Sequence, residues 1–152
     1  MKIPVIGVAL LVIIIGGGFA LYSSQRAKPT AAPTATATTR PTAAPQGAAM
    51  VEVKPAALSG NELLGETAFN AKCAACHGPS AAGQNGIAPP LVHKIYEPGH
   101  HGDQAFFMAA KNGARAHHWT FGDMPPVEGL TTSDIDNIVA YVRALQRANG
   151  IN

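Results

Sequence analysis

The pentapeptide Cys73-Ala74-Ala75-Cys76-His77 decides how this 152-residue chain is interpreted. The spacing C-x-x-C-H is the attachment motif of c-type haem. Each cysteine thiol forms a thioether with one vinyl group of the porphyrin, so the two thiols must lie one helical turn apart. The adjoining imidazole is then held against the iron as the proximal ligand. The motif therefore predicts one covalently attached haem c, bound by Cys73 and Cys76 and with His77 as an iron ligand.

Three other uses of a cysteine pair compete with haem attachment. A redox dithiol like that of thioredoxin needs a preceding strand within a β-α-β pattern, and the sequence offers neither. A zinc site needs four ligands, whereas the chain has two cysteines and no second ligand pair at zinc-finger spacing. A disulfide across two intervening residues closes too small a loop to stabilise the fold much. Haem attachment is therefore the preferred interpretation.

Residues 1–21 form an apolar segment that predicts a transmembrane anchor. The stretch from Ile3 to Leu21 has no charged or strongly polar residue and is long enough to cross a hydrocarbon core as a helix. A cleaved signal peptide is the alternative, because Gly18 and Ala20 place small residues at a possible cleavage site. The apolar run continues past that site, which favours the anchor. Because bacteria attach c-type haem outside the cytoplasm, we expect a single-pass membrane protein whose haem domain lies on the outer side, periplasmic or extracellular.

Residues 22–58 are dominated by Ala, Thr and Pro and contain a short repeat, KPTAAP at 28–33 and RPTAAP at 40–45. No apolar periodicity runs through this segment, and its side chains offer too little area to offset the entropy of ordering it. We therefore expect a disordered linker whose residues do not touch the folded core.

Residues 59–152 are the part of the chain able to form a packed domain. From Gly60 onward, eight acidic residues stand against six Lys and Arg, which gives this part a charge near minus two, although the whole chain carries +2. The basic residues form no cluster, so the sequence does not predict nucleic-acid binding.

Helix caps and loop residues divide this domain. Ser59-x-x-Glu62 has the form of a capping box and begins a helix that runs into the haem motif. Residues 78–90 are rich in Gly and Pro, which predicts a loop. A short helix is expected at 103–112, with Gly113 as its C-terminal cap.

The last helix has the clearest pattern. Thr131-x-x-Asp134 begins it and Gly150 ends it. Its apolar stripe consists of Ile135, Ile138, Val139, Val142 and Leu145. No run of residues predicts a strand, so the fold class is all-α, with one covalently bound haem supplying much of a small core.

Two further motifs occur in a known order around the haem motif. Gly65-x-x-x-Phe69 precedes it, and the sequence NIVAYV, which includes Tyr141, occupies residues 137–142. With these motifs, residues 60–150 resemble a class I, mitochondrial-type monohaem cytochrome c, in a membrane-anchored bacterial form. The resemblance implies the cytochrome c fold, in which the glycine lets the last helix approach and the two aromatic rings pack together.

Two loops extend the resemblance. The loop APPL at 88–91 is similar to the one in which a proline carbonyl, here that of Pro89, accepts the Nδ1 proton of the haem histidine and so fixes the tautomer of His77. The loop GDMPP at 122–126 resembles the one that delivers a sulfur ligand to the iron. Residues 93–119 depart from the family, because histidines are unusually dense there.

Met124 is the expected sixth ligand of the iron. It lies on a loop stiffened by two following prolines, which present the thioether at low entropic cost. Met108 lies among apolar residues of a predicted helix, where an unbranched thioether is more often core filler. The other two methionines lie in the anchor and the linker. His117 or His118 is the main rival as ligand.

Five further histidines and two aromatic residues with polar atoms are candidates for the surroundings of the haem. Besides His77, the histidines are His93, His100, His101, His117 and His118. Adjacent histidines point in different directions, so we interpret these residues as solvated imidazoles. The alternative is a second metal site, for example for copper, built from the two adjacent pairs, since imidazole suits copper and zinc. Trp119 and Tyr96 are candidates to donate hydrogen bonds to haem propionates, although plain packing is equally compatible with Tyr96.

The predicted ligand pair determines the predicted function. His and Met together raise the reduction potential and fill both axial positions of the iron. We therefore expect an electron carrier rather than an enzyme, tethered to the membrane, which shuttles single electrons between membrane or periplasmic redox proteins of a respiratory chain. No small-molecule substrate is expected. The alternatives are a haem-based sensor or small peroxidase with a displaceable sixth ligand, and an electron-entry subunit fixed within an oxidase or reductase.

Overall fold

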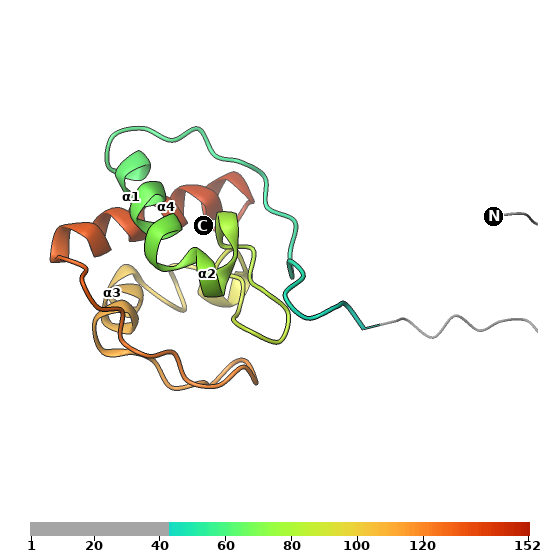
Figure 1. Cartoon of the computed structure of the whole chain (residues 1–152). Coiled ribbons are helices and arrows are strands. Elements are labelled where there is room, and N and C mark those ends of the chain that lie inside the picture. Colours follow the sequence, from blue (N-terminus) through green and yellow to red (C-terminus); the bar gives the residue numbers. More distant parts are fainter. Residues whose placement is uncertain (1–42) are drawn as a thin grey trace, which may run out of the picture. The chain divides into compact units, whose positions relative to one another are not determined.

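Residues 43–152 are described by a computed structural model of the chain (Figure 1). The expected anchor at 1–21 and the expected linker as far as residue 42 lie outside the described residues. Within 43–152, no helix is both long enough and apolar enough to span a bilayer. The membrane anchor therefore stays a prediction from the sequence.

Helices make up the regular structure of this region. In chain order the elements are α1 (Asn61–Lys72), α2 (Ala74–His77), the 3-10 helices η1 (Pro79–Ala81) and η2 (Lys94–Tyr96), α3 (Asp103–Asn112) and α4 (Thr132–Ala148). Between residues 43 and 152, strand-like pairing is limited to two isolated bridges, Gln84 with Ala88 and Ala114 with Met124. The predicted all-α class is confirmed.

The crossing of α1 and α4 is the main helix contact (Figure 1). Gly65 makes it possible, because a Cβ atom there would lie 1.9 Å from the carbonyl oxygen of Asn137 on α4. One turn later the ring of Phe69 packs on that of Tyr141, with centroids 5.4 Å apart. The glycine and the aromatic pair therefore have the places that the resemblance implied.

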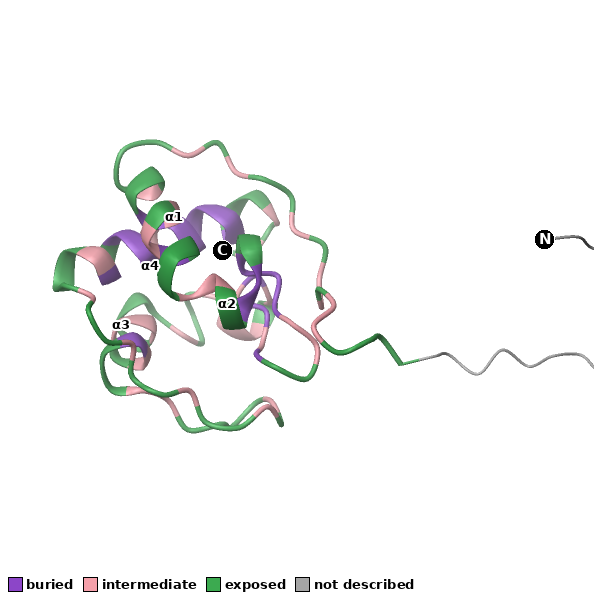
Figure 2. Cartoon of the chain, viewed as in Figure 1, coloured by how far each residue is buried: buried purple, intermediate pink, exposed green. Residues whose placement is uncertain are grey.

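α4 contributes more buried residues than any other helix of the described region (Figure 2). All five side chains of its predicted apolar stripe are at most 7% exposed, which confirms the stripe. Full burial of an aliphatic side chain contributes about 1.5–3 kcal/mol, so this helix makes a large contribution to the stability of the core.

A buried cation on α4 holds the middle of the chain in place. The Nε atom of Arg143 donates to the carboxylate of Asp103 at 2.7 Å, and the same guanidinium donates to the carbonyl of Tyr96 at 2.7 Å. It also donates to the carbonyl of His101. These bonds fix η2 and the start of α3 against α4, and they satisfy a charge that would be costly to bury alone.

The caps of α4 agree with the sequence. The side chain of Thr131 accepts from the backbone N–H of Asp134, and the Asp134 carboxylate accepts from the backbone N–H of Thr131 at 2.9 Å, which completes the predicted capping box. At the other end Gly150 has a φ of 76°. The N–H groups of Gly150 and Ile151 bond to carbonyls of the last turn, as in a Schellman motif.

The predicted capping box of α1 is wrong. Gly60 is the N-cap, and no side chain caps the helix. Gly60 has a φ of 49°, so the chain enters the helix one residue later than the box requires. The backbone N–H of Ser59 still donates to the carboxylate of Glu62 at 3.1 Å, which leaves half of the motif. The predicted loop at 78–90 likewise contains the 3-10 helix η1.

The part of the predicted linker that lies among the described residues is packed against the domain. Residues 43–58, which we call the strap, lie against the domain and lead into α1 (Figure 1). Gly47 donates to the carbonyl of Asn85 at 2.9 Å, and Met50 donates to that of Ala82 at 3.1 Å. The expectation that linker residues do not touch the core is therefore wrong for the strap.

The far end of the strap is tied to the end of α4. The side-chain amide of Asn149 bonds both backbone groups of Lys54, accepting from its N–H at 2.9 Å and donating to its carbonyl at 3.0 Å. Apolar strap residues pack against the core, namely Val53, Ala56 and Leu58. Loop and helix-end backbone groups need hydrogen-bond partners, and the strap supplies them without any apolar periodicity of its own.

Candidate functional site

A cavity of about 520 Å³ is lined by residues of α1, α2, α3 and α4 and of the loops that follow α2 and α3. Its volume falls in the range of cofactor pockets. The six residues predicted for the site all line it, namely Cys73, Cys76, His77, Pro89, Trp119 and Met124. The fold thus brings together side chains that are far apart in the sequence.

The two cysteines stand at the junction of α1 and α2. The carbonyl of Cys73 accepts hydrogen bonds from the N–H groups of Cys76 and His77 at 3.1 and 2.9 Å, so the two thiols lie one helical turn apart. No disulfide joins them. Burial, and secondarily the charge of Cys76, raises the pKa of the Cys73 thiol to about 11. Because redox-active dithiols have lowered thiol pKa values, the redox-dithiol alternative fits this pair poorly.

His77 is 7% exposed, and its ring nitrogen Nδ1 lies 2.9 Å from the carbonyl oxygen of Pro89. A carbonyl can only accept, so Nδ1 carries the proton and Nε2 keeps its lone pair. Burial lowers the pKa of His77, and the bond to Pro89 partly opposes this shift. The imidazole is therefore neutral and fixed in the tautomer that can bind a metal through Nε2. This is the contact that the resemblance implied.

A glycine brings the proline loop close to the histidine. The N–H of Gly83 donates to the carbonyl of His77 at 2.7 Å. Gly83 has a φ of 73°, and a Cβ atom there would lie 2.4 Å from the backbone nitrogen of Pro90. A side chain at this position would push the Pro89 carbonyl away from the imidazole.

Met124 lies on the cavity wall within a loop that is tied to the end of α3. Ala114 and Met124 exchange two backbone hydrogen bonds, of 2.9 and 2.8 Å. Gly113 allows this approach, because a Cβ atom there would lie 2.6 Å from the carbonyl oxygen of Met124. The backbone of the predicted ligand is thus held in place on the wall.

Met108 also lines the cavity, but from α3 rather than from the loop of Met124, which corrects its prediction as core filler. Its side chain is 44% exposed and belongs to neither buried cluster. α3 presents this position at the rim of the cavity. The apolar neighbours in the sequence instead suggest the interior.

Trp119 contributes a buried polar atom to the cavity. Its indole Nε1 has no hydrogen-bond partner among the described residues. Burial raises the pKa of the Tyr96 phenol, and the nearby Trp119 side chain opposes that shift, although the two groups do not reach hydrogen-bond geometry. An unpartnered buried N–H costs about 1–3 kcal/mol, so a bound group with an acceptor oxygen is the natural partner for it.

Sequence comparison agrees with this geometry, since the family model for cytochrome c matches residues 63–146. The chain belongs to the cytochrome c family. It is also similar to cytochrome c-554(547) of Halothiobacillus neapolitanus, with 32% identity over 96 residues that cover 58% of this chain and 100% of the relative. With one C-x-x-C-H motif, it is a class I monohaem cytochrome c and thus a haem protein of electron transfer.

The cavity of this cytochrome c fits the covalently attached haem c of its family. Two thiols one turn apart, a buried imidazole with a free Nε2 and an unpartnered indole N–H line the same space. Cys73 and Cys76 would hold the group through thioethers, and His77 would bind the iron. Trp119 would donate to a propionate. Met124 stays the predicted sixth ligand.

From the sequence, a site built from the two adjacent histidine pairs of this cytochrome c is only the alternative to solvated imidazoles. His101, His117 and His118 line the cavity, whereas His93 instead accepts a hydrogen bond from the N–H of Ile95 at its own 3-10 helix. The two adjacent pairs, 100–101 and 117–118, come together in space. Only their dense spacing hinted at this in the sequence.

Proposed function

We propose that this cytochrome c is a membrane-tethered carrier that passes single electrons between redox proteins of a respiratory chain, on the outer side of the cell membrane. Its family supports the electron transfer, and the apolar segment at 1–21 supports the tether. A tether keeps the domain near membrane-bound or periplasmic partners and so raises its effective concentration.

The observation that carries the proposal is a nitrogen donor and a sulfur donor on the walls of one cavity. His77 offers a buried imidazole oriented by Pro89, and Met124 offers a thioether on a loop held by two backbone hydrogen bonds. When bound, haem iron supplies a one-electron couple, and His and Met ligation raises its potential. If His77 and Met124 both held the iron, no open position would remain for a substrate, which favours a carrier over a sensor or peroxidase.

The two methionines on the cavity wall allow a matched test of the sixth ligand. Met124→Leu should abolish the sulfur-to-iron absorption band near the red edge of the ferric spectrum, and Met108→Leu should leave it in place. Loss of the band in Met108→Leu alone would transfer the role to that residue. No band in the unaltered holoprotein would instead favour an imidazole ligand such as His117 or His118.

The tether is tested by cell fractionation. The full chain should sediment with membranes, and a variant in which residues 1–21 are replaced by a cleavable signal peptide should be soluble and carry haem. Recovery of the full chain in the soluble periplasmic fraction would show that the segment is a signal peptide.

The charge of the domain predicts the kind of partner surface. From Gly60 onward acidic residues outnumber basic ones by eight to six, and the haem propionates add negative charge. Partners with basic docking surfaces are therefore favoured, and the second-order rate of electron transfer should fall as ionic strength rises. A rate that is indifferent to salt would remove this part of the proposal.

A further inference from the structure

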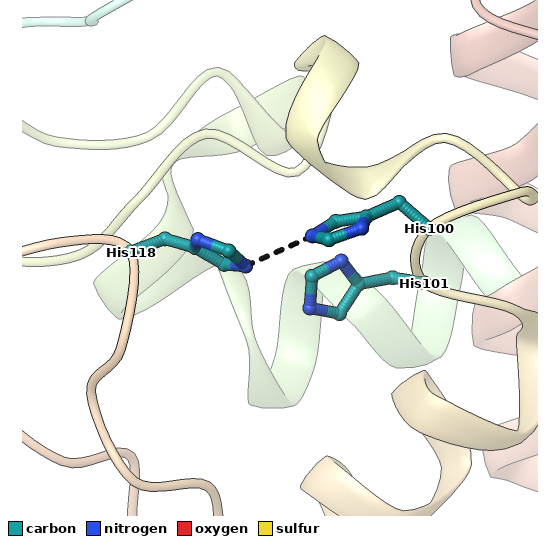
Figure 3. A group of neighbouring side chains, drawn as sticks. All are labelled: His100, His101 and His118. Atoms are coloured by element: carbon teal, nitrogen blue, oxygen red, sulfur yellow. Dashed lines mark hydrogen bonds between the residues drawn. The ribbon is translucent and has the colours of Figure 1, made fainter.

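Four of the histidines interlock at one edge of the haem cavity. The Nε2 atoms of His100 and His118 are 3.2 Å apart, and those of His101 and His117 are 3.3 Å apart. A ring nitrogen from each of His100, His101 and His118 lies within 4.8 Å of the others (Figure 3). Each histidine is therefore within hydrogen-bond distance of a histidine of the other loop, and its sequence neighbour contacts a different one.

The hydrogen bonds of two of these rings fix their tautomers. Nδ1 of His101 lies 2.8 Å from the carbonyl oxygen of Ile95, and Nδ1 of His117 lies 2.7 Å from that of Arg115. Both Nδ1 atoms must therefore donate, which leaves a lone pair on each Nε2. This is the arrangement that His77 has with Pro89, and it is typical of metal-binding imidazoles.

The contact between His101 and His117 is then a contact of two lone pairs. Neither Nε2 has a proton to donate, so the 3.3 Å separation is favourable only with an additional proton or a cation at the pair. A cation would satisfy the facing lone pairs without charging a ring.

The separations also suit a particular ion. Two nitrogens bound at 2.0–2.1 Å to one tetrahedral zinc ion are about 3.3 Å apart, which matches both cross-loop pairs. Square-planar coordination, as preferred by Cu(II), would bring neighbouring nitrogens to about 2.8 Å. The distance between the two pairs must shorten, and it can do so by rotation of the exposed side chains of His100, His117 and His118.

We propose that His100, His101, His117 and His118 form a tetrahedral zinc site separate from the haem iron. The site clamps the loop before α3 to the loop after it. His101 is its fixed member, because Arg143 donates to its carbonyl and Ile95 accepts from its ring. Zinc there would stiffen the loop that leads to Trp119 and Met124.

The experiment uses the haem-loaded protein after treatment with a chelator. Zinc alone is added and followed by calorimetry, and bound metal is counted by mass spectrometry after desalting. We expect one zinc per chain in addition to the iron, with nitrogen ligands near 2.0 Å in zinc-edge X-ray absorption. His118→Ala and His101→Gln should each weaken zinc binding on the order of 100-fold or more.

His93→Asn is the matched control. His93 lies outside the cluster, and asparagine keeps an acceptor for the N–H of Ile95, so its zinc affinity should equal that of the unaltered protein. Equal affinity in His118→Ala, or no zinc bound by the unaltered protein, would overturn the proposal and leave a shared proton at the cluster. Binding of copper without zinc would overturn the tetrahedral zinc assignment.

The haem spectrum separates this site from iron ligation. If the four histidines bind zinc, His118→Ala leaves the axial-ligand absorption bands of the haem unchanged. A changed axial-ligand spectrum in His118→Ala or in His117→Ala would place that imidazole on the iron and would exclude the four-histidine site.

Discussion

Around the cavity, the cysteine wall is formed by α1, α2 and α4, whereas the methionine wall, residues 113–126, is formed by loops. On the cysteine wall, Phe69, His77 and Val142 are 0%, 7% and 1% exposed. The residues of the methionine wall are only partly buried or exposed. Its two ends are joined by the two backbone hydrogen bonds between Ala114 and Met124.

This difference in burial predicts that the two walls affect different properties, the cysteine wall the stability of the domain and the methionine wall the reduction potential of the haem. Helix packing fixes the cysteines and the proximal imidazole, so changes on that wall should unfold the domain. The methionine wall can change its contacts at lower cost in stability, because loops bury less apolar area. Changes of spectrum and potential without unfolding should therefore come mainly from substitutions on the methionine wall.

The largest expected effect on stability is that of Gly65→Ala at the α1–α4 crossing. The added Cβ would meet the Asn137 carbonyl at 1.9 Å, and the backbone atoms there cannot move aside cheaply. We expect a loss of about 3 kcal/mol in the free energy of unfolding, measured by guanidinium denaturation of the holoprotein. Gly99→Ala is the control, because nothing lies within 4 Å of its added Cβ. Equal stability of the two variants would show that the crossing is not close-packed.

Trp119→Phe tests the methionine wall. If the buried indole N–H donates to a haem propionate, its loss should cost about 1–3 kcal/mol in the unfolding of the holoprotein and should alter the pH dependence of the reduction potential. Tyr96→Phe should change that pH dependence less. A neutral or stabilising effect of Trp119→Phe, with an unchanged potential, would mean that the N–H has no partner in the holoprotein either.

Asn149→Ala tests whether the strap belongs to the same folding unit as the cysteine wall. The variant removes two hydrogen bonds to the backbone of Lys54 and one to the carbonyl of Leu145 at the end of α4, and we expect a loss of about 1–2 kcal/mol in chemical denaturation. Asn70→Ala, at an exposed position of α1, is the control and should change stability by less than about 0.5 kcal/mol. Equal losses in both variants would argue that the strap adds nothing to the fold.

The smallest expected effect comes from acid. The backbone N–H and the hydroxyl of Thr131 hold the pKa of Asp134 below its ordinary value. This carboxylate therefore stabilises the folded state above the ordinary value of about 3.8, and the contribution is lost as the pH falls through the lowered folded-state pKa. Asp134→Asn should flatten the acid limb of thermal stability measured between pH 5 and pH 2. An unchanged limb would assign acid unfolding to other groups.

Sequence reasoning succeeded where a local pattern dictates local geometry. The C-x-x-C-H spacing, the apolar stripe of α4 and the capping box at Thr131 each depend on residues within a few turns of one helix. The resemblance to a known family added the pairing of Gly65 with α4 and of His77 with Pro89.

It failed where the partner of a group lies far along the chain. The strap has no periodicity, yet it is ordered because its backbone meets unpaired groups near residue 85 and at Asn149. The N-cap of α1 is Gly60 rather than the predicted Ser59, because the residue before the helix has a positive φ. Met108 was placed in the core by its apolar neighbours, although α3 presents it at the cavity rim.

By itself, the sequence determined an all-α domain, the three residues that would hold the haem and an apolar segment at 1–21, because each of these follows from composition or short-range spacing. Only the tertiary structure decided that the strap is part of the domain, that Met108 and Met124 share one cavity and that two separate histidine pairs interlock. Those contacts join residues 16 to 95 positions apart. Groups that far apart in the sequence meet only when the whole domain packs, which no local pattern encodes.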